Sequence, residues 1–522
     1  MRRRAGSRSR LPTGREFLIV AFMAERLLAA IESLGFRPRC LRVACGVALL
    51  LAIATLFGRP PAFDDAWFGD QAYFVATEGR LRSELFRGML GWEEWVYITQ
   101  KAGVLLTAVF VRILGLTPLA VHLPGLIYAT LCGTLVVVYL RRVRPGDRGT
   151  LLVAGILLAA NPSVVAFAFL VRPELMLASL AFASYALLDA VFCRDWPIAR
   201  RAALAGALAG ASPLFHLNGS MIMAAGGLFL LVRRQWLPAA VYSVTALGVA
   251  LLYVVDALVR GDLGQMVTQF RFDPATAGST SLSAKLATVG DVGNVFFHSP
   301  AEIAISVMLL FPALAFSRLR RREIPTPREA RGLVTYSAAL LLSLLVLLNR
   351  PAHMYALLFC PFGVALFSLL HGQLRAATAV GLRRTSALIL CTCLVFGISH
   401  SIARIVRNAE ARDEMQWNAY VASLLPKKHV AVIAPLAFVF GQIDDYRIMG
   451  LAKYAHPDRV SGSQWDMSTL MADAARWDVE YVVFERRRGH HNFDPPEYPV
   501  RVGQYERFVD RPPLTIYRRG SP

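Results

Sequence analysis

The 522-residue chain is poor in charged side chains and in cysteine. Charged residues make up 18% of it, whereas a soluble globular protein carries about 25%. The seven cysteines form no C-x-x-C pair, so the sequence indicates neither a zinc site nor a disulfide framework. The basic N-terminus has no short apolar core followed by a small-residue cleavage site, so we expect no cleaved signal peptide.

Familiar nucleotide-binding and hydrolase motifs are also missing. We find no Walker A loop, Rossmann fingerprint, HExxH or GxSxG element at a plausible position. Their absence removes support from nucleotide hydrolysis and from hydrolase chemistry.

The chain is correspondingly rich in apolar residues. They make up 55% of the chain, and the mean hydropathy is +0.46. This composition excludes a disordered chain, a fibrous repeat or a nucleic-acid-binding domain as the main content. The net charge of +20 comes from arginines in short clusters between apolar runs, which is typical of cytoplasmic loops. We therefore predict an α-helical polytopic membrane protein with the lipid bilayer, and no nucleic acid, as a partner.

A membrane span needs about 20 mostly apolar residues. Eleven stretches are candidates, two of them short: 41–58, 120–140, 150–170, 174–192, 202–216, 218–232, 236–257, 300–317, 332–349, 353–370 and 386–404. We therefore expect about eleven transmembrane helices.

The orientation depends on one further apolar run, residues 102–116. This run is short for a span and contains Arg112, so it could instead lie in the membrane interface. If it lies there, the basic loops all fall on the cytoplasmic side, as the positive-inside rule requires. These loops are 1–40, 141–149, 193–201, 233–235, 318–331 and 371–384. We predict the surface helix on this ground.

This orientation divides the chain into three parts. Residues 1–40 form a basic cytoplasmic N-terminus, and 41–404 form the transmembrane domain. The loops 59–119 and 258–299 then lie outside the cytoplasm, as does the polar tail 405–522. Within the tail, residues 429–435, 478–485 and 515–519 have strand patterns, so we predict a small extracytoplasmic α/β domain.

The candidate chemistry begins at an acidic pair just after the first span. Asp64 and Asp65 stand beside Phe63, Trp67 and Phe68 at the expected membrane surface. Carboxylates held there can act as a general base or bind a divalent metal ion. The alternative is that they only favour the N-terminus of the next helix, where acidic side chains are stabilised.

The first span followed by this element resembles the GT-C glycosyltransferases. The similarity is greatest to the branch of protein O-mannosyltransferases and aminoarabinose (lipid A) transferases, which carry Asp-Glu-x-x-Tyr at this place. The present chain has Asp64–Asp65–Ala66–Trp67–Phe68, a partial match. In the family the first acid is the catalytic carboxylate, so the resemblance assigns that role to Asp64, with Asp65 beside it.

Other features follow in the order of the family. Gln100–Lys101–Ala102–Gly103 stands where the family often has Glu-Lys-Pro-Pro, and the resemblance implies that Lys101 contacts a lipid phosphate. Arg172–Pro173–Glu174 begins one span, and Asn349–Arg350–Pro351 precedes another. The resemblance covers roughly 60–370 and the extracytoplasmic tail.

The resemblance implies an inverting transfer of a sugar from a dolichyl- or undecaprenyl-phosphate carrier. The acceptor would be a glycolipid, a cell-wall glycan or a protein outside the cytoplasm. Cations at helix ends can neutralise the phosphate as it leaves. The candidates are Lys101, Arg172, Arg350 and Arg271, although an arginine can equally anchor a helix at the membrane surface. We expect the bacterial inner membrane, because no eukaryotic targeting or retention signal is found.

Further polar residues on the same face are candidates for substrate binding. They are Glu93, Glu94, His298, His353 and Tyr355, each of which could equally be structural. The sequence indicates no cofactor other than a candidate divalent metal ion at the acidic residues.

Two other functions compete with sugar transfer. A transporter or lipid flippase would place charges at mid-depth in the spans, where this chain has almost none. The other is a noncatalytic glycan- or lipid-binding protein on the same scaffold, an alternative that the departures at Asp65, Phe68 and Gln100 leave open.

Overall fold

The computed structural model describes most of the chain. It covers residues 37–272, 282–321, 327–347, 352–375, 379–455, 464–486 and 493–520, with short pieces between 25 and 34. Arg350 lies outside the described residues.

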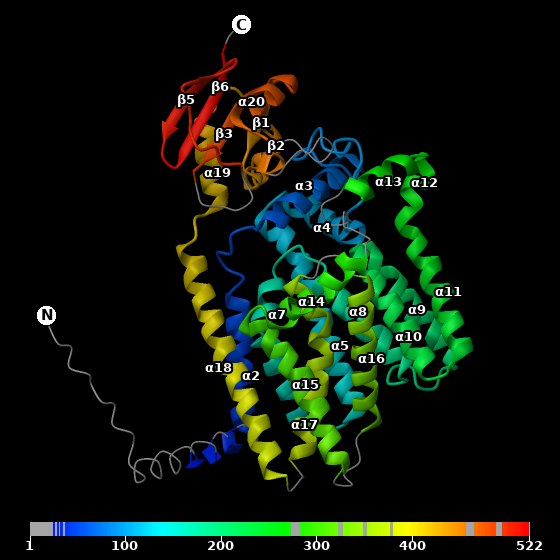
Figure 1. Cartoon of the computed structure of the whole chain (residues 1–522). Helices are drawn as coiled ribbons and strands as arrows, with labels where there is room; N and C mark the ends of the chain where they lie inside the picture. Colours follow the sequence, from blue (N-terminus) through cyan, green and yellow to red (C-terminus); the bar gives the residue numbers. More distant parts are fainter. Residues whose placement is uncertain are drawn as a thin grey trace, which may run out of the picture.

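A bundle of long helices forms the larger part of the molecule (Figure 1). Its helices are α2 (Pro38–Ala54), α5 (Pro118–Val143), α6 (Arg148–Ala159), α8 (Glu174–Leu188), α9 (Ile198–Phe215), α10 (Ser220–Val232), α11 (Trp236–Ala250), α15 (Pro300–Arg321), α16 (Arg328–Leu347), α17 (Cys360–Leu374) and α18 (Val380–Glu410). Short helical pieces connect or extend them: α7 (Pro162–Phe167), η1 (Leu217–Gly219), η2 (Leu251–Val254) and η3 (His353–Phe359). Each of the eleven stretches predicted as spans overlaps one of these helices.

Six helical stretches among the described residues are long and apolar enough to cross a membrane. They are Pro118–Val143, Trp236–Arg260, Pro300–Leu319, Arg328–Leu347, His353–Leu374 and Val380–Ser423. Three shorter apolar stretches accompany them: Arg148–Ala159, Glu174–Leu188 and Leu217–Val232. The chain is thus an integral membrane protein, as predicted, while the total of eleven crossings stays a prediction.

Small residues allow close contact between neighbouring helices. Gly206 and Gly210 of α9 face the backbone carbonyls of Tyr242 and Ala246 in α11, and a Cβ at either glycine would overlap these oxygens. Close backbone approach through small residues is the usual way in which helices associate in a membrane.

Several helices lie at the same end of the bundle as the C-terminal domain (Figure 1). They are α3 (Phe63–Glu78), α4 (Lys101–Leu114), α12 (Val255–Arg260) and α13 (Leu263–Phe272); α14 (Leu282–Phe297) packs against α15 and η3. On α4, Leu105, Val109 and Ile113 follow each other at intervals of four and are 56%, 54% and 71% exposed. An apolar exposed stripe on a short helix supports the predicted position of this segment in the membrane interface.

The C-terminal domain contains one six-stranded sheet. Its strands are β1 (Ala431–Ala434), β2 (Arg447–Gly450), β3 (Val479–Glu485), β4 (Arg501–Val502), β5 (Tyr505–Arg511) and β6 (Leu514–Arg519), in the order β2-β1-β3-β6-β5-β4. β1 runs parallel to β2 and β3, and the other pairs are antiparallel. The helical elements are α19 (Glu414–Ser423), α20 (Met467–Arg476), η4 (Leu436–Val439) and η5 (Leu451–Ala455). The predicted α/β domain is thus present, and α18 continues to Glu410 before it begins.

The C-terminal domain and the segment after α3 share one hydrophobic core. Leu85 and Trp92 of that segment belong to the same buried cluster as Phe438 and Ile448 of the domain. The amide of Gly450, at the end of β2, donates a 2.8 Å hydrogen bond to the carbonyl of Leu85. This shared core fixes the domain above α3.

Asp70 of α3 is fully buried where these two parts meet. One oxygen accepts hydrogen bonds from the Ser83 hydroxyl at 2.6 Å and the Leu85 amide at 3.4 Å. Burial raises the pKa of Asp70 to about 7, an effect that the Ser83 hydrogen bond only partly offsets. An ionised Asp70 therefore destabilises the folded protein.

Asp70→Asn is expected to raise the thermal unfolding temperature by several degrees, and by more at pH 8 than at pH 5. The folded carboxyl takes up its proton at about pH 7, against about 3.9 in an unfolded chain. The folded state therefore binds more protons between these values, and stability falls as the pH rises. Differential scanning fluorimetry in detergent measures the effect, with the exposed Asp291→Asn as the control. An equal gain at both pH values would contradict the raised pKa.

Candidate active site

The site begins at the first turn of α3, where two adjacent carboxylates have different surroundings. Asp65 is fully buried. It accepts hydrogen bonds from the amides of Ala62 at 2.7 Å and Val171 at 3.0 Å. His122 Nε2 of α5 lies 3.1 Å from Asp65 Oδ2, the oxygen that also accepts from Ala62. Asp65 thus joins the start of α3 to α5 and to the loop before α8.

Asp64 instead lies in a charged cluster. The guanidinium of Arg172 forms an ion pair with Asp64, and its Nη2 lies 2.7 Å from Glu174 Oε1. The side chain of Glu174 is 2% exposed, whereas those of Asp64 and Arg172 are each 22% exposed. One cation therefore stands between two carboxylates, and only Asp64 and Arg172 are open to an incoming molecule.

The surroundings of Asp64 favour a proton acceptor. Burial raises the pKa of Asp64, and this effect outweighs the opposing influence of Arg172; the nearby charges of Glu174 and Asp65 raise it further. A carboxylate with a raised pKa takes a proton more readily at neutral pH. The two carboxylates thus differ in their surroundings: Asp64 is partly exposed and paired with a cation, whereas Asp65 is buried and holds the start of α3 in position.

Lys101, at the start of α4, has a different set of partners. Its ammonium donates to the Tyr253 carbonyl at 2.6 Å and forms an ion pair with Asp256 of α12. The neighbouring Gln100 donates to the Val171 carbonyl at 2.9 Å. Gln100 therefore connects α4 to the loop that carries Arg172, while the charge of Lys101 is taken up by Asp256.

The η3 helix carries two further predicted residues, His353 and Tyr355, and contacts Arg172 through Met354. The sulfur of Met354 contacts the guanidinium of Arg172. Tyr355 accepts a hydrogen bond from the Asn218 side chain of η1. The ring of His353 stacks on His298, with centroids 4.7 Å apart. Three of the predicted substrate-binding residues thus lie at η3, namely His298, His353 and Tyr355. Met354 connects η3 to Arg172.

The structure places the remaining predicted residues elsewhere. Arg271 is exposed on α13, with its guanidinium 5.5 Å from the ring centre of Phe272. Glu93 accepts a hydrogen bond from the Gly88 amide at 3.1 Å, and Glu94 is exposed. Arg350 lies outside the described residues.

Several residues that the sequence did not single out contribute to the site. His122 holds Asp65, Asp256 pairs with Lys101, and Glu174, named above only as part of Arg172–Pro173–Glu174, pairs with Arg172. These partners lie 57, 155 and 2 positions from the residues they contact. Only the last contact is local, and the sequence signal for it is the Arg-Pro-Glu tripeptide itself.

An apolar cavity of about 300 Å³ lies between α14, α15, α16 and α17. Phe359, the last residue of η3, lines it together with Phe296. A second cavity of about 280 Å³ continues between α15 and α16 and shares Ala313 and Val334 with the first. The short helix η3 therefore both lines the apolar cavity, through Phe359, and contacts Arg172, through Met354.

No metal centre is apparent in the part of the chain that the structure describes. It contains no group of three or more His, Cys, Asp or Glu side chains placed to hold a metal ion.

Comparison with known proteins identifies the fold. No protein-family model matches the chain, and no curated protein matches it. Its structure is similar to ArnT from Cupriavidus metallidurans, with 12% identity and a TM-score of 0.58. The match covers 84% of this chain and 92% of apo ArnT, and 92% and 98% for ArnT bound to undecaprenyl phosphate. The chain therefore has the fold of ArnT, a GT-C glycosyltransferase, as the resemblance in its sequence indicated.

Proposed function

We propose that the protein is a membrane glycosyltransferase that moves a sugar from a polyprenyl-phosphate carrier to an acceptor outside the cytoplasm. The observation that carries the proposal is the ion pair between Asp64 and Arg172. It combines a carboxylate of raised pKa with a phosphate-binding cation at one end of the helix bundle.

In this mechanism Arg172 binds the donor phosphate. A phosphate competes with Asp64 for the guanidinium, because both are anions that accept its hydrogen bonds. Binding of the donor thus releases Asp64 from its ion pair while Glu174 continues to hold Arg172. The loss of the cationic neighbour raises the pKa of Asp64 further and makes it a better base.

The reaction is then a single displacement. Asp64 takes the proton of the acceptor hydroxyl, and the oxygen attacks the anomeric carbon on the face opposite the phosphate. The bond between this carbon and the phosphate oxygen breaks, and polyprenyl phosphate leaves with both electrons. Arg172 neutralises the charge that develops on the leaving group. Attack from the opposite face inverts the anomeric configuration.

The apolar cavity beside η3 supports a lipid-linked donor. A prenyl chain needs an apolar path in the membrane that ends close to a cation at the surface. Phe359 lines the cavity, and Met354, on the same helix, contacts Arg172. The similar protein ArnT was crystallised with undecaprenyl phosphate, a ligand of this class.

The other candidate residues take supporting parts in the proposal. His298, His353 and Tyr355 lie around η3, where they could contact the sugar or its phosphate. Lys101 contributes only if it leaves Asp256. Arg271 and Arg350 stay candidates for phosphate binding at the same face, and Glu93 and Glu94 for acceptor binding. We propose the bacterial inner membrane, with the basic loops in the cytoplasm and this site outside.

Gly125→Ala is expected to reduce transfer by about tenfold or more, a loss of about 1.4 kcal/mol in transition-state stabilisation. A Cβ on Gly125 of α5 would overlap the carbonyl of Leu170 and displace the loop that carries Arg172. Gly133→Ala on the same helix is the matched control, because its Cβ would meet only Leu158 Cδ1 at 3.8 Å. Steady-state transfer assays on both variants measure the effect. Equal activity of the two would argue against the assigned position of Arg172.

The proposal is tested by transfer of labelled sugar from a panel of polyprenyl-phosphate sugars in proteoliposomes. Transfer that depends on the wild-type protein and releases polyprenyl phosphate supports the enzyme. Movement of the intact labelled lipid across the bilayer, without transfer, would instead indicate a flippase. Saturable binding without either would indicate a noncatalytic glycan- or lipid-binding protein.

A further inference from the structure

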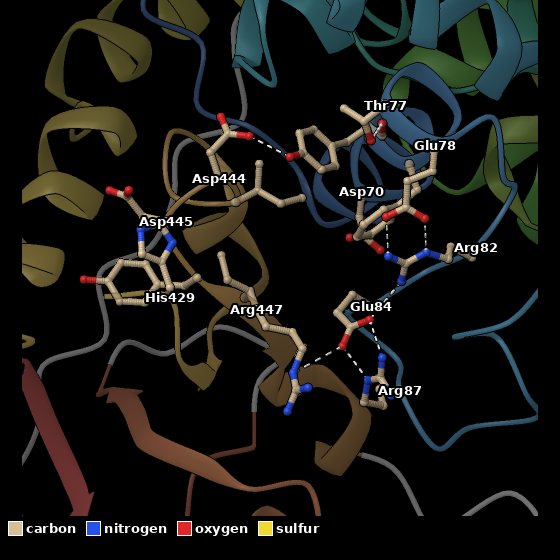
Figure 2. Close-up of a pocket in the computed structure, with 15 residues that line it drawn as sticks. Asp70, Thr77, Glu78, Arg82, Glu84, Arg87, His429, Asp444, Asp445 and Arg447 are labelled. Carbon is tan, nitrogen blue, oxygen red and sulfur yellow. Dashed lines mark hydrogen bonds and ion pairs between the residues drawn. The ribbon is translucent and has the colours of Figure 1, made fainter. Parts of the chain in front are cut away.

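A polar cavity of about 450 Å³ lies between α3, the segment that follows it and the C-terminal domain (Figure 2). Its volume falls within the range of about 300–1,000 Å³ that is usual for small-molecule sites. The domain contributes His429 and the stretch Ile443–Ile448 to the lining. No step of the proposed transfer uses this cavity.

One face of α3 forms a wall of the cavity. Asp70, Tyr73, Phe74, Thr77 and Glu78 line it, at the three- and four-residue spacing of a single helix face. Asp70 at the inner end is fully buried, whereas Thr77 and Glu78 near the mouth are exposed. The cavity is thus a pocket with a buried floor and an accessible opening.

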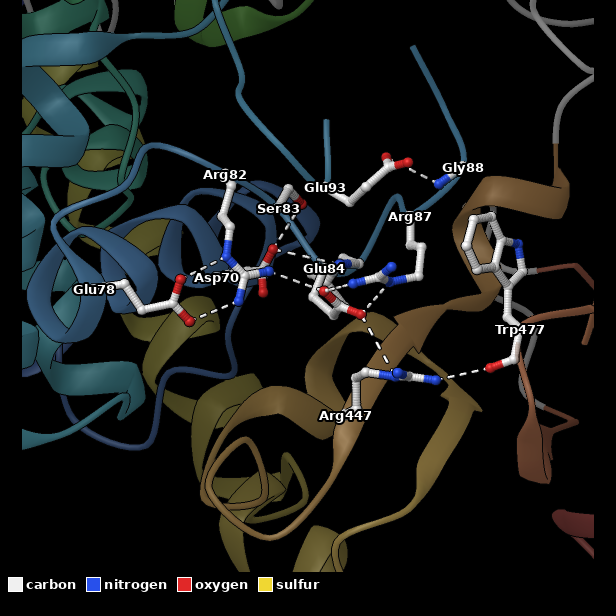
Figure 3. A network of polar contacts seen from close by, with 11 residues as sticks. Asp70, Glu78, Arg82, Ser83, Glu84, Arg87, Gly88, Glu93, Arg447 and Trp477 are labelled. Carbon is white, nitrogen blue, oxygen red and sulfur yellow. Dashed lines mark hydrogen bonds and ion pairs between the residues drawn. The ribbon is translucent and has the colours of Figure 1, made fainter. Parts of the chain in front are cut away.

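The cations of this pocket are already paired (Figure 3). Arg82 contacts Glu78 at 2.7 Å and Glu84 at 2.9 Å. Arg87 also binds Glu84, and Arg447 lies 3.8 Å from it. A phosphate or sulfate group in the pocket would meet a carboxylate beside each guanidinium. The arrangement therefore disfavours a strongly anionic ligand.

Hydrogen-bond acceptors are in excess at the same place. The Oδ1 atom of Asp70 is buried and has no hydrogen-bond partner among the described residues. Asp444 accepts from the Tyr73 hydroxyl at 2.6 Å through Oδ1, and Asp445 pairs with Lys428 through Oδ2. Carboxylates have further acceptor capacity beyond these contacts. The pocket is suited to a ligand with several hydroxyl donors.

We propose that this pocket binds a neutral saccharide, which is part of the acceptor of the transfer reaction. Neighbouring sugar hydroxyls can donate to Asp70, Asp444 and Asp445. The apolar face of a sugar ring can lie against Tyr73, because the guanidinium of Arg82 already covers the ring of Phe74. The identification as acceptor rests on the proposed function. It assigns the C-terminal domain a part in acceptor recognition, since β2 and the preceding turn form the opposite wall.

The position of the pocket agrees with this role. Asp64 and Asp70 lie on the same helix, six residues and therefore about 9 Å apart along its axis. They face different sides, because Asp64 meets Arg172 and Asp70 meets Ser83. An acceptor bound in the pocket must therefore pass around α3 to reach Asp64, which requires a chain of several sugars rather than a single one.

The test measures binding of the purified full-length protein to an array of neutral and acidic oligosaccharides, followed by titration with the best binder. The variant Thr77→Trp places a large side chain in the pocket without removing a charged group. Thr268→Trp is the matched control, because both threonines are exposed on a helix and donate to the carbonyl four residues earlier. We expect Thr77→Trp to weaken binding of a neutral oligosaccharide at least about tenfold and Thr268→Trp to leave it unchanged. Both variants are checked for an unaltered unfolding temperature.

Glu78→Gln provides a second test that keeps the size of the side chain. It removes one carboxylate of the lining and is expected to weaken the same titration severalfold. Binding of acidic oligosaccharides only, equal binding by Thr77→Trp and Thr268→Trp, or no glycan binding by the wild type would each overturn the inference. Because binding is measured without donor, the inference can fail while sugar transfer survives, and transfer can fail while binding survives.

Discussion

Asp64→Asn is expected to lower the kcat of sugar transfer by about 10²–10⁴-fold, the usual contribution of a general base. The amide has nearly the same shape as the carboxylate but cannot take the proton of the acceptor hydroxyl. The ion pair with Arg172 is lost as well, although one hydrogen bond to the guanidinium can persist. Transfer by equal amounts of purified wild type and variant in proteoliposomes measures the effect.

The pH dependence of kcat/KM in the wild type tests the role of the Asp64 carboxylate independently. Because burial raises the pKa of Asp64, kcat/KM is expected to fall with decreasing pH well before the ordinary aspartate value of about 3.9 is reached. The sign follows from the role, since only the ionised carboxylate can act as a base. Asp64→Asn should retain low activity without this acidic limb.

Glu506→Gln serves as the control for Asp64→Asn. Glu506 is a carboxylate of β5 that is 54% exposed and lies in the C-terminal domain. This variant should transfer at the rate of the wild type. Equal transfer by Asp64→Asn and wild type would remove Asp64 from the chemistry.

Arg172→Ala should both destabilise the protein and raise the KM for the donor. It leaves Asp64 and Glu174 without their cation, and leaving a buried carboxylate such as Glu174 unpaired costs on the order of 3–5 kcal/mol. Arg172→Lys keeps the charge but cannot span both carboxylates with a planar fork. We therefore expect Arg172→Lys to recover part of the stability and little of the donor affinity.

Arg233→Ala separates the two effects of Arg172. Arg233 pairs with the buried Asp189 at 2.7 Å and is 24% exposed, much like Arg172 at 22%. Its removal should also lower the unfolding temperature, but it should leave the KM for the donor unchanged. A rise of the same size in both variants would show that Arg172 acts only through stability. Thermal unfolding and donor titration on the same preparations distinguish these results.

The sequence was sufficient to predict the membrane class because hydropathy over about 20 residues is a strong and local signal. The strands β1, β3 and β6 are also predicted from a local signal, because each is a short run rich in apolar or β-branched residues. β4 has only two residues, β2 has just two apolar residues between Arg447 and Gly450, and β5 carries charged side chains at exposed positions. These strands are specified by pairing with neighbours, which a single sequence does not display.

In the candidate site, too, the sequence identifies residues by local motifs but does not show their long-range contacts. The resemblance assigns the catalytic role to Asp64 and places Asp65 beside it, but the sequence does not show what holds either side chain. The structure separates them through His122 and Val171, which lie 57 and 106 positions from Asp65. Lys101 was assigned to phosphate from its place in the sequence, and its partner Asp256 could not be foreseen from 155 positions away. Long-range contacts of this kind are set by packing of the bundle.

The most direct test of sugar transfer at Asp64 follows the anomeric signals by NMR during reaction of one polyprenyl-phosphate sugar of defined configuration. We expect the donor signal to disappear as an acceptor-linked signal of the opposite configuration grows, and we expect Asp64→Asn to slow both changes together. A product of retained configuration would contradict a single displacement with Asp64 as the base. Absence of any new glycosidic signal across the donor panel would contradict the transfer itself.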